Sequence, residues 1–237
     1  MKTIGVVGGL GPMATIHYLE RIVQLTDAES DQDHPRIYLE SIPDIPDRTT
    51  YILGKSNKNP YPVIRCAAER LIRNGADFIT IPCVTAFYFK ERFAKDLSKP
   101  VLSLIDLLVE NLQKNKVKKV GIMATTGTIQ SEIISKSLHN NGIETVVPDS
   151  FYQEQVMEII YNQIKKGKCA DMKMFHNIEK HLLEQEIEKI ILGCTELPLV
   201  KKEHELGEGY VDVIDILAQE AVKQSGAKVK AKDGWII

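Results

Sequence analysis

The 237-residue sequence lacks several features that would assign it to a particular class of protein. Its four cysteines form no CxxC pair, so the close ligand pairs of a typical zinc site are missing. No apolar run approaches the roughly 18 residues that a membrane-spanning helix needs. Acidic and basic residues nearly balance, giving a formal net charge of −2. This balance argues against a nucleic-acid or anionic-membrane partner, which would favour a basic patch.

The N-terminus shows no signal-peptide pattern either. Residues 1–9 run directly into a strand-like segment and contain no cleavage site. We therefore expect a cytoplasmic protein whose cysteines stay reduced and unpaired.

Short continuous apolar runs, rich in β-branched residues, recur along the chain. Continuous runs indicate strands buried on both faces, which is typical of a parallel sheet covered by helices. We predict strands over residues 3–7, 36–41, 77–81, 117–124, 142–147 and 188–192. Apolar residues at helical spacing predict helices over 14–27, 61–74, 101–115, 129–140, 151–166, 172–185 and 211–225. The alternation of strands and helices predicts an α/β fold.

The order of strand, glycine turn, helix and cysteine-ending strand occurs twice. We interpret it as two similar α/β lobes, each a parallel sheet flanked by helices, related by pseudo-twofold symmetry. Residues 1–98 plus 208–237 are expected to form the N-terminal lobe, and residues 99–207 the C-terminal lobe. Since open α/β sheets bind ligands at the carboxyl ends of their strands, we expect the active site between the lobes. The alternative is that βα units resemble one another without duplication.

Two cysteines, Cys83 and Cys194, each follow a predicted strand and precede a threonine within two residues. Buried cysteines often act only as small hydrophobes, the role we assign to Cys66 and Cys169, which lie in or beside helix patterns. Two thiols facing one cleft could act on opposite faces of one substrate carbon. One thiolate removes a proton while the opposite thiol delivers another. The pair therefore predicts acid–base residues that invert a stereocentre.

Hydroxyl groups gather at the same strand ends. A carbanion beside a carboxylate needs hydrogen-bond donors aimed at the developing charge. Threonine hydroxyls and the N–H groups of helix N-termini supply such donors, although a threonine there is commonly only a helix cap. The candidates are Thr85, Thr126, Thr128 and Thr195.

The glycine-rich turn after the first strand allows a different interpretation. Gly9, Gly11 and Ala14 satisfy the dinucleotide-binding spacing, and Glu40 ends the second strand. This pattern is short, and a dinucleotide site would leave the paired cysteine–threonine turns without a role.

Two cationic segments also need an interpretation. Arg48 lies in a loop rich in proline and aspartate, where it could grip a carboxylate with both arms of its guanidinium or simply staple the loop. Lys165 and Lys166 end a predicted helix, where lysines ordinarily compensate the helix dipole.

Five segments, in this order, together resemble the aspartate/glutamate racemase family and in particular its aspartate-racemase branch. They are GGLGPMAT, IPDRTTYILG, PCVTA, ATTGT and LGCTELP, and they span Gly8 to Pro198. The resemblance implies a two-lobed α/β fold, no metal or other cofactor, two-base proton transfer, a small amino-acid substrate and a homodimer.

The resemblance also implies roles for particular residues. Cys83 and Cys194 would be the two acid–base groups, and Arg48 would contact the side-chain carboxylate of the substrate. A lysine, either Lys165, which we take as the candidate, or its neighbour Lys166, would help it. The remaining pocket residues would be Met13, Thr85, Thr126 and Thr195.

The sequence departs from the family pattern beside the first cysteine. Val84 and Phe87 stand where the family commonly has asparagine and histidine, so the amino-acid head group loses an expected polar partner. Glu196 stands where glutamate racemases usually have histidine, which favours the aspartate-racemase branch. The alternatives to an aspartate or glutamate racemase are a cysteine-dependent isomerase or decarboxylase of related fold, or a catalytically weak amino-acid-binding homologue.

Overall fold

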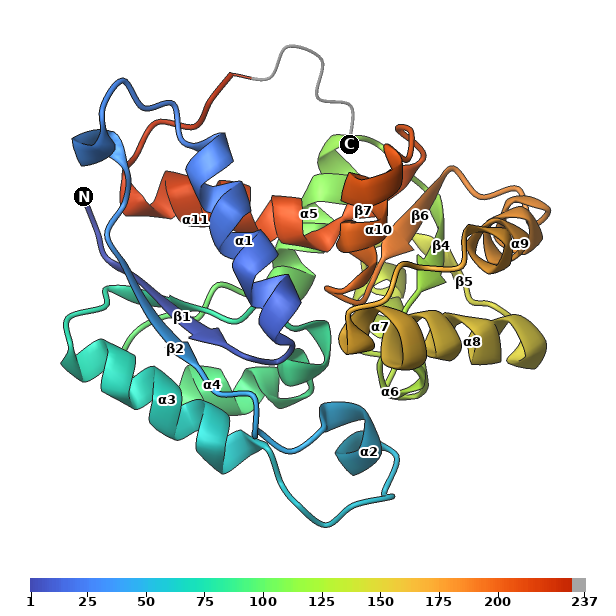
Figure 1. Cartoon of the computed structure of the whole chain (residues 1–237), viewed down its shortest axis with the longest axis horizontal. Coiled ribbons are helices and arrows are strands. Elements are labelled where there is room, and N and C mark those ends of the chain that lie inside the picture. Colours follow the sequence, from blue (N-terminus) through green and yellow to red (C-terminus); the bar gives the residue numbers. More distant parts are fainter. Residues whose placement is uncertain (232–237) are drawn as a thin grey trace.

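The computed structural model describes residues 1–231 and contains two parallel β-sheets, one in each lobe (Figure 1). The first sheet has the strand order β2-β1-β3, and the second has the order β5-β4-β6-β7. Their strands are β1 (Ile4–Gly8), β2 (Ile37–Ser41), β3 (Phe78–Thr80), β4 (Lys119–Met123), β5 (Glu144–Val146), β6 (Lys189–Leu192) and β7 (Tyr210–Asp212). The predicted two-lobed α/β class is confirmed. Residues 232–237, which we assigned to the N-terminal lobe, lie outside the described residues.

The two sheets repeat one topology. In each sheet the first strand of its half lies between the second and the third, β1 between β2 and β3 and β4 between β5 and β6. Every neighbouring pair is parallel, and all five residues of β1 are buried, as the continuous apolar runs predicted. The shared order agrees with two copies of one βα unit.

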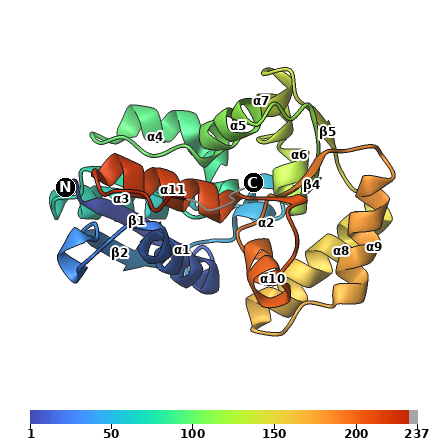
Figure 2. The ribbon, with the colours of Figure 1, turned by 90° about the horizontal axis from the view of Figure 1, so that it is seen from above.

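Helices cover both sheets (Figures 1 and 2). Those of the first half are α1 (Pro12–Leu25), α2 (Arg48–Ile52), α3 (Tyr61–Arg73), α4 (Lys90–Asp96) and α5 (Leu104–Lys114), with 3-10 turns at Asp31–Asp33 and Val84–Phe89. Those of the second half are α6 (Thr126–Gln130), α7 (Ser135–His139), α8 (Ser150–Met157), α9 (Met172–Leu183), α10 (Leu197–His204) and α11 (Val213–Ser225). Within residues 1–231, no helix is both long enough and apolar enough to cross a membrane.

The glycine turn after β1 is held by its own backbone and by Thr15. Gly9 has a φ of +88°, and a Cβ there would lie 2.4 Å from the backbone nitrogen of Ile42. The Thr15 hydroxyl accepts from the Gly9 N–H and donates to the Gly11 carbonyl, both at 2.9 Å. Pro12 opens α1, as expected, because its missing N–H is not needed in the first turn. The turn thereby carries Leu10 and Gly11 to the cleft.

Two predicted helices are broken in the structure. The segment 129–140 forms two short helices, because Glu132 adopts a left-handed φ of 53° that ends the first. The segment 151–166 starts as α8 but continues as a π-helix over Glu158–Gln163 and a 3-10 turn over Ile164–Lys166. It ends at Gly167, whose φ of 71° suits a C-terminal glycine, as the sequence predicted.

The segment 211–225 was predicted to be entirely helical, but it begins in a strand. Strand β7 pairs with β6 in the second sheet, and α11 starts only where the Asp212 carboxylate accepts the N–H groups of Ile214 and Asp215. We expected the chain to return to the first lobe after residue 207, but residues 210–212 still belong to the second sheet, and α11 begins only after Asp212.

The other expected lobe boundary, between residues 98 and 99, stays a prediction. Val101 still pairs with Ile79 beside the first sheet.

One apolar core runs through both lobes. The main cluster contains Val6 and Ile79 of the first sheet, and continues through α5 and α11 to Val120, Ile122 and Ile191 of the second sheet. Their neighbours on the other face of the second sheet, Ile190 and Leu192 among them, pack separately against α8, α9 and α10. The lobes are therefore joined through one face of the second sheet, while α8 to α10 have a core of their own.

Candidate active site

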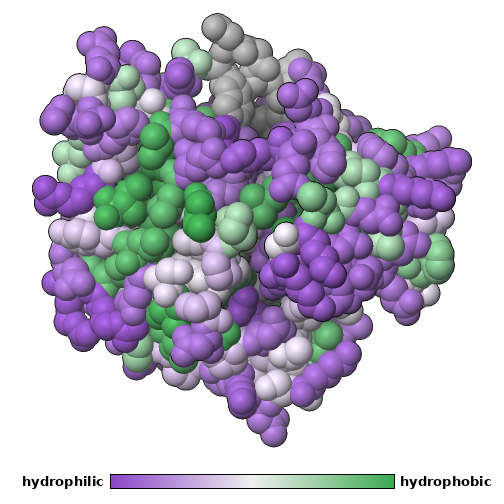
Figure 3. Space-filling view, viewed as in Figure 1, coloured by the Kyte–Doolittle hydropathy of each residue, from purple (hydrophilic) through white to green (hydrophobic). Residues whose placement is uncertain are grey.

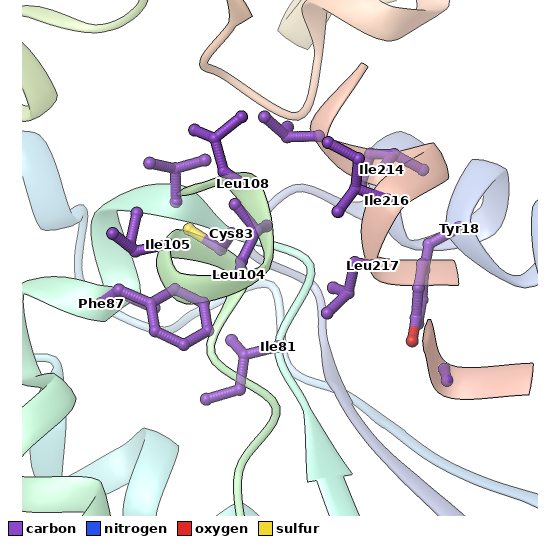
Figure 4. Packing of buried hydrophobic residues seen from close by; sticks show 14 of the residues in the cluster. Tyr18, Ile81, Cys83, Phe87, Leu104, Ile105, Leu108, Ile214, Ile216 and Leu217 are labelled. Carbon is purple, nitrogen blue, oxygen red and sulfur yellow. The ribbon is translucent and has the colours of Figure 1, made fainter. Parts of the chain in front are cut away.

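Both candidate thiols lie at the carboxyl ends of strands and line the same cavity. Cys83 follows β3 after two residues and begins the 3-10 turn, whereas Cys194 follows β6 after Gly193. Both are buried, with 4% and 8% of their surfaces exposed. Cys83 belongs to the main apolar cluster, together with Ile81, Phe87 and Leu104 (Figure 4). The fold thus brings one thiol from each sheet to one site.

The cavity between the thiols is nearly closed. Its volume is ≈ 10 Å³, about what a single water molecule needs. An outer cavity of ≈ 330 Å³ adjoins it and shares the side chains of five residues with it. These shared residues are Asp47, Arg48, Tyr161, Lys165 and Glu196. With these side chains in place, the inner cavity is too small for a ligand larger than a water molecule.

Cys194 is hydrogen-bonded to a buried carboxylate. Its Sγ donates to Glu196 Oε2 at 2.9 Å. Burial, followed by the neighbouring Glu196 charge, raises the pKa of the Cys194 thiol, and Lys165 opposes this only in part. The structure therefore favours the protonated form of Cys194.

Cys83 has a hydroxyl and a cation beside it instead. Its Sγ lies 3.3 Å from Thr85 Oγ1. Burial lowers the pKa of Arg48, but the ionised forms of Cys83 and then Asp47 outweigh burial and leave that pKa raised. Arg48 is thus a permanent positive charge within reach of the first thiol.

Arg48 also clamps two loops of the first lobe. Its Nη2 donates to the Leu10 carbonyl at 3.0 Å, and its Nη1 donates to the carbonyls of Ile45 and Pro46 at 3.3 and 3.1 Å. Its buried Nε has no hydrogen-bond partner. The loop-stapling and ligand-binding interpretations of Arg48 are therefore compatible, because the Nε–H is left over for a ligand.

The irregular helical segment 158–166 contacts the N-terminus of α2 beside the cavity. Tyr161 donates its hydroxyl to Asp47 Oδ2 at 2.9 Å, while Asp47 caps α2 through the Thr50 N–H. Lys165 Nζ lies 4.5 Å from the centre of the Tyr161 ring and 3.6 Å from Glu196 Oε1. Burial lowers the pKa of Lys165, but Glu196 and Cys194 outweigh it and raise that pKa overall.

Three of the four predicted threonines line the inner cavity, namely Thr85, Thr128 and Thr195. Thr126 does not, because its hydroxyl is turned toward the Gln153 amide, 3.4 Å away. Its neighbour Thr125 lines the cavity instead, where its hydroxyl contacts those of Thr49 and Thr128, each at 3.2 Å.

The other predicted residues are distributed between the two cavities. Lys165 lines both, and Met13, 53% exposed, lines the outer one. Of the two departures from the family pattern, Val84 lines the inner cavity, whereas Phe87 packs edge-on against Phe93 in the core. Only Val84 therefore changes the surface that a ligand would meet.

Several residues that line the cavities were not predicted from the sequence. Asp47 could have been found from its capping position three residues before Thr50, and Thr125 from the same pattern with Thr128. Tyr161 carries no local signal, because its contact with Asp47 spans 114 positions.

The glycine turn does not form a dinucleotide site. A Cβ on Gly11 would lie 2.6 Å from Glu196 Oε1, so a carboxylate occupies the space that a pyrophosphate would need. Glu40 binds the guanidinium of Arg70, with Nε 2.8 Å from Oε1, and is not available to a ribose. In the described part of the chain, no group of three or more His, Cys, Asp or Glu could hold a metal ion.

Comparisons with known proteins match nearly the whole chain. A family model described as Asp/Glu/Hydantoin racemase covers residues 7–221. An aspartate racemase from Picrophilus torridus is 31% identical in sequence over 97% of this chain and 96% of that one, with a TM-score of 0.83. The broad specificity amino-acid racemase RacX of Bacillus subtilis (strain 168) is 27% identical over 208 residues, which are 83% of this chain and 86% of that protein. A glutamate racemase of Aquifex pyrophilus is 30% identical over 178 residues, 69% of this chain and 66% of that protein.

Proposed function

Because the chain belongs to the Asp/Glu/hydantoin racemase family, we propose that it is an amino-acid racemase that interconverts the L and D forms of aspartate or glutamate. The observation that carries this proposal is the pair of buried thiols, Cys83 and Cys194, which reach one cavity from the strand ends of two sheets. No cofactor takes part in the reaction that we propose.

Proton transfer would use one thiol on each face of the substrate. The Cys83 thiolate takes the α-proton, so the Cα–H bond breaks and an S–H bond forms. Cys194 then gives its proton to the opposite face, which forms a new Cα–H bond of inverted configuration and leaves a thiolate. The reverse reaction uses the same groups with their roles exchanged.

The carbanionic intermediate needs compensation for its negative charge. Donors that line the same cavity as the thiols include the hydroxyls of Thr85, Thr128 and Thr195. Lys165 adds a positive charge at the same edge of the cavity. These groups act in a site that excludes most water, where each electrostatic contact is stronger than in solution.

Two observations bear on the substrate. The unpartnered Nε of Arg48 and the buried Lys165 suit a carboxylate on the substrate side chain, which supports aspartate or glutamate. Val84 supports a second candidate, a racemase with broader preference, since an apolar side chain stands where the head group would find a polar partner. The similarity to a broad specificity racemase agrees with that candidate.

The proposal is tested by incubating purified protein with single enantiomers of acidic and neutral amino acids and following their optical activity. We expect aspartate or glutamate to racemise after dialysis against a chelator and after hydroxylamine treatment, and a thiol alkylator to abolish the reaction. Binding without racemisation would favour the amino-acid-binding alternative. Release of carbon dioxide would favour the decarboxylase alternative.

A further inference from the structure

Glu196 is placed to control the second thiol. Its side chain is 4% exposed and lines both the inner and the outer cavity. Its Oε2 accepts from Cys194 Sγ at 2.9 Å and lies 3.5 Å from the Thr195 hydroxyl. Its Oε1 is buried without a hydrogen-bond partner, 3.6 Å from Lys165 Nζ.

The backbone holds this carboxylate in place. Glu196 is the residue before α10, and the Leu197 N–H bonds back to the Cys194 carbonyl at 2.9 Å, so the thiol and the carboxylate share one tight turn. Against the turn lies Gly11, where a Cβ would come within 2.6 Å of Oε1. Glycine at that position therefore leaves room for the carboxylate.

The contact favours one protonation state. If Cys194 ionised, a thiolate and a carboxylate would lie at hydrogen-bond distance in a buried site, where like charges repel strongly. Burial and Glu196 raise the pKa of this thiol, in that order. The titratable and charged groups around the two thiols are Glu196, Lys165, Tyr161, Asp47 and Arg48.

These groups are divided unequally between the two thiols. The carboxylate of Glu196 bonds directly to Cys194, whereas the guanidinium of Arg48 interacts with Cys83. Lys165 acts on the Cys194 thiol in the opposite direction to Glu196, and it also pairs with Glu196.

We propose that Glu196 is a positioning residue that keeps the resting proton on Cys194, so that the free protein waits with Cys83 as the base. This inference rests on the proposed racemase function. Glu196 does not contact the reacting carbon in this scheme; it acts through the thiol. The enantiomer whose α-proton faces Cys83 can then react with the free protein directly. The other enantiomer reacts only after the proton has moved from Cys194 to Cys83.

The kinetic signature of this asymmetry is constrained by thermodynamics. Two enantiomers have equal free energies, so kcat/KM must be the same in both directions. The asymmetry therefore appears in kcat and KM separately: the ratio of the two enantiomers' kcat values should differ from one and should equal the ratio of their KM values. In Glu196→Gln, both ratios should move toward one.

The direct test measures where Cys194 ionises. In a Cys83→Ser background, the rate at which iodoacetamide labels Cys194 is followed against pH by mass spectrometry of the peptide. Glu196→Gln keeps the shape of the side chain and removes its charge. We expect the midpoint of labelling to fall by about 1–3 pH units, the usual effect of a neighbouring charge. Glu203→Gln, an exposed carboxylate on α10, is the matched control and should leave the midpoint unchanged.

An equal labelling midpoint for Cys194 in Cys83→Ser and in Cys83→Ser with Glu196→Gln would overturn the proposal. If Glu196→Gln fails to fold, Glu196→Ala is measured in the same way, and an unchanged midpoint for Cys194 would contradict us. Labelling needs no substrate, so it is independent of the racemase assignment. A shifted midpoint without racemisation of any amino acid would support the role of Glu196 and refute the proposed function.

Discussion

At the scale of single residues, the two thiols differ in the charge beside them. Cys83 lies near the cation of Arg48, and Cys194 lies against the anion of Glu196. A two-base reaction requires one thiolate and one thiol at the same time. The charges beside the two thiols therefore differ before any substrate binds.

Replacement of either thiol should abolish efficient racemisation. We expect Cys83→Ser and Cys194→Ser each to lower turnover at least about a hundredfold, because a hydroxyl is a much weaker acid–base group at neutral pH. Cys169→Ser, at an exposed cysteine outside the cavity, is the control and should retain full activity. Full activity of either cavity variant would rule out the two-base scheme.

Arg48 should discriminate between acidic and neutral substrates. Arg48→Ala is expected to lower kcat/KM for aspartate and glutamate about ten- to a hundredfold, the loss of one charge-assisted contact, and to lower it less for a neutral amino acid. The loop contacts of Arg48 with Leu10, Ile45 and Pro46 would also be lost, so thermal stability is measured alongside. Equal losses for all three substrates would mean that Arg48 serves only as the clamp of these loops.

The sequence led to some cavity residues and not to others for identifiable reasons. Cys83, Cys194 and their threonines follow strand ends, a position that local patterns reveal. Thr126 was chosen over Thr125 because the pattern does not show which hydroxyl of the pair faces the cleft. Tyr161 could not be found at all, since only the packing of the two halves brings it to Asp47.

At the scale of elements, strands β1 to β6 were predicted within a few residues because short apolar runs mark them, whereas β7 was missed because its residues were assigned to a helix. The helices were predicted less well. The segment from 151 to 166 has helical composition throughout. Its second half nevertheless departs from α-helical geometry, first as a wider π-helix and then as a tighter 3-10 turn. That irregular stretch carries Tyr161 and Lys165, and such departures are frequent at functional sites. Periodicity alone does not encode them.

The N-cap of α11 gives the protein a pH-dependent weak point. Burial, and then the neighbouring Asp215, raises the pKa of Asp212 from 3.8 to about 7. The carboxyl group contributes its full stability below about pH 3.8, where it is protonated in both states. That contribution falls as pH rises toward 7, because the unfolded chain releases the proton first.

Asp212→Asn should remove this dependence while keeping a good cap. We expect the Tm at pH 7.5 to rise by several degrees, since ~1 kcal/mol moves the Tm of a domain of this size by roughly 2–4 °C. The gain should shrink toward pH 4. Asp171→Asn, at the exposed N-cap of α9, provides the comparison. An equal Tm change at both pH values would contradict the assigned cause.

At the scale of the whole molecule, the continuous core limits how the site can open. One apolar cluster joins the first sheet to one face of the second, so separating the lobes there would expose a large buried surface. Helices α8 to α10 have their own core, and the irregular stretch between α8 and α9 carries Tyr161, whose hydrogen bond to Asp47 links the two halves beside the cavity. We expect substrate entry to move these elements first.

The homodimer expected from the family resemblance stays a prediction, and the exposed face of α1 is a suitable surface. Ile16 and Val23 are 59% and 53% exposed there, and Leu39 on the edge strand β2 is 43% exposed. Figure 3 shows an apolar area over these two elements. An apolar face beside an unpaired strand edge commonly binds another chain.

Ile16→Asp with Val23→Asp should therefore give a monomer by light scattering, where we expect the unsubstituted protein to have twice the mass of one chain. Phe151→Asp removes a comparably exposed apolar side chain from α8 and should leave the mass unchanged. A monomeric unsubstituted protein would refute the expected homodimer, and a dimeric double variant would move its interface elsewhere.

The most direct measurement of the central claim is racemisation of L-aspartate and L-glutamate in D2O, followed by circular dichroism and proton NMR. We expect optical activity to decay and the D product to carry deuterium at Cα, because the second thiol has exchanged its proton with solvent. Both changes should disappear in Cys83→Ser and Cys194→Ser. Unchanged optical activity of both amino acids would contradict the assignment to an aspartate or glutamate racemase, and undiminished racemisation in either serine variant would contradict the two-thiol mechanism.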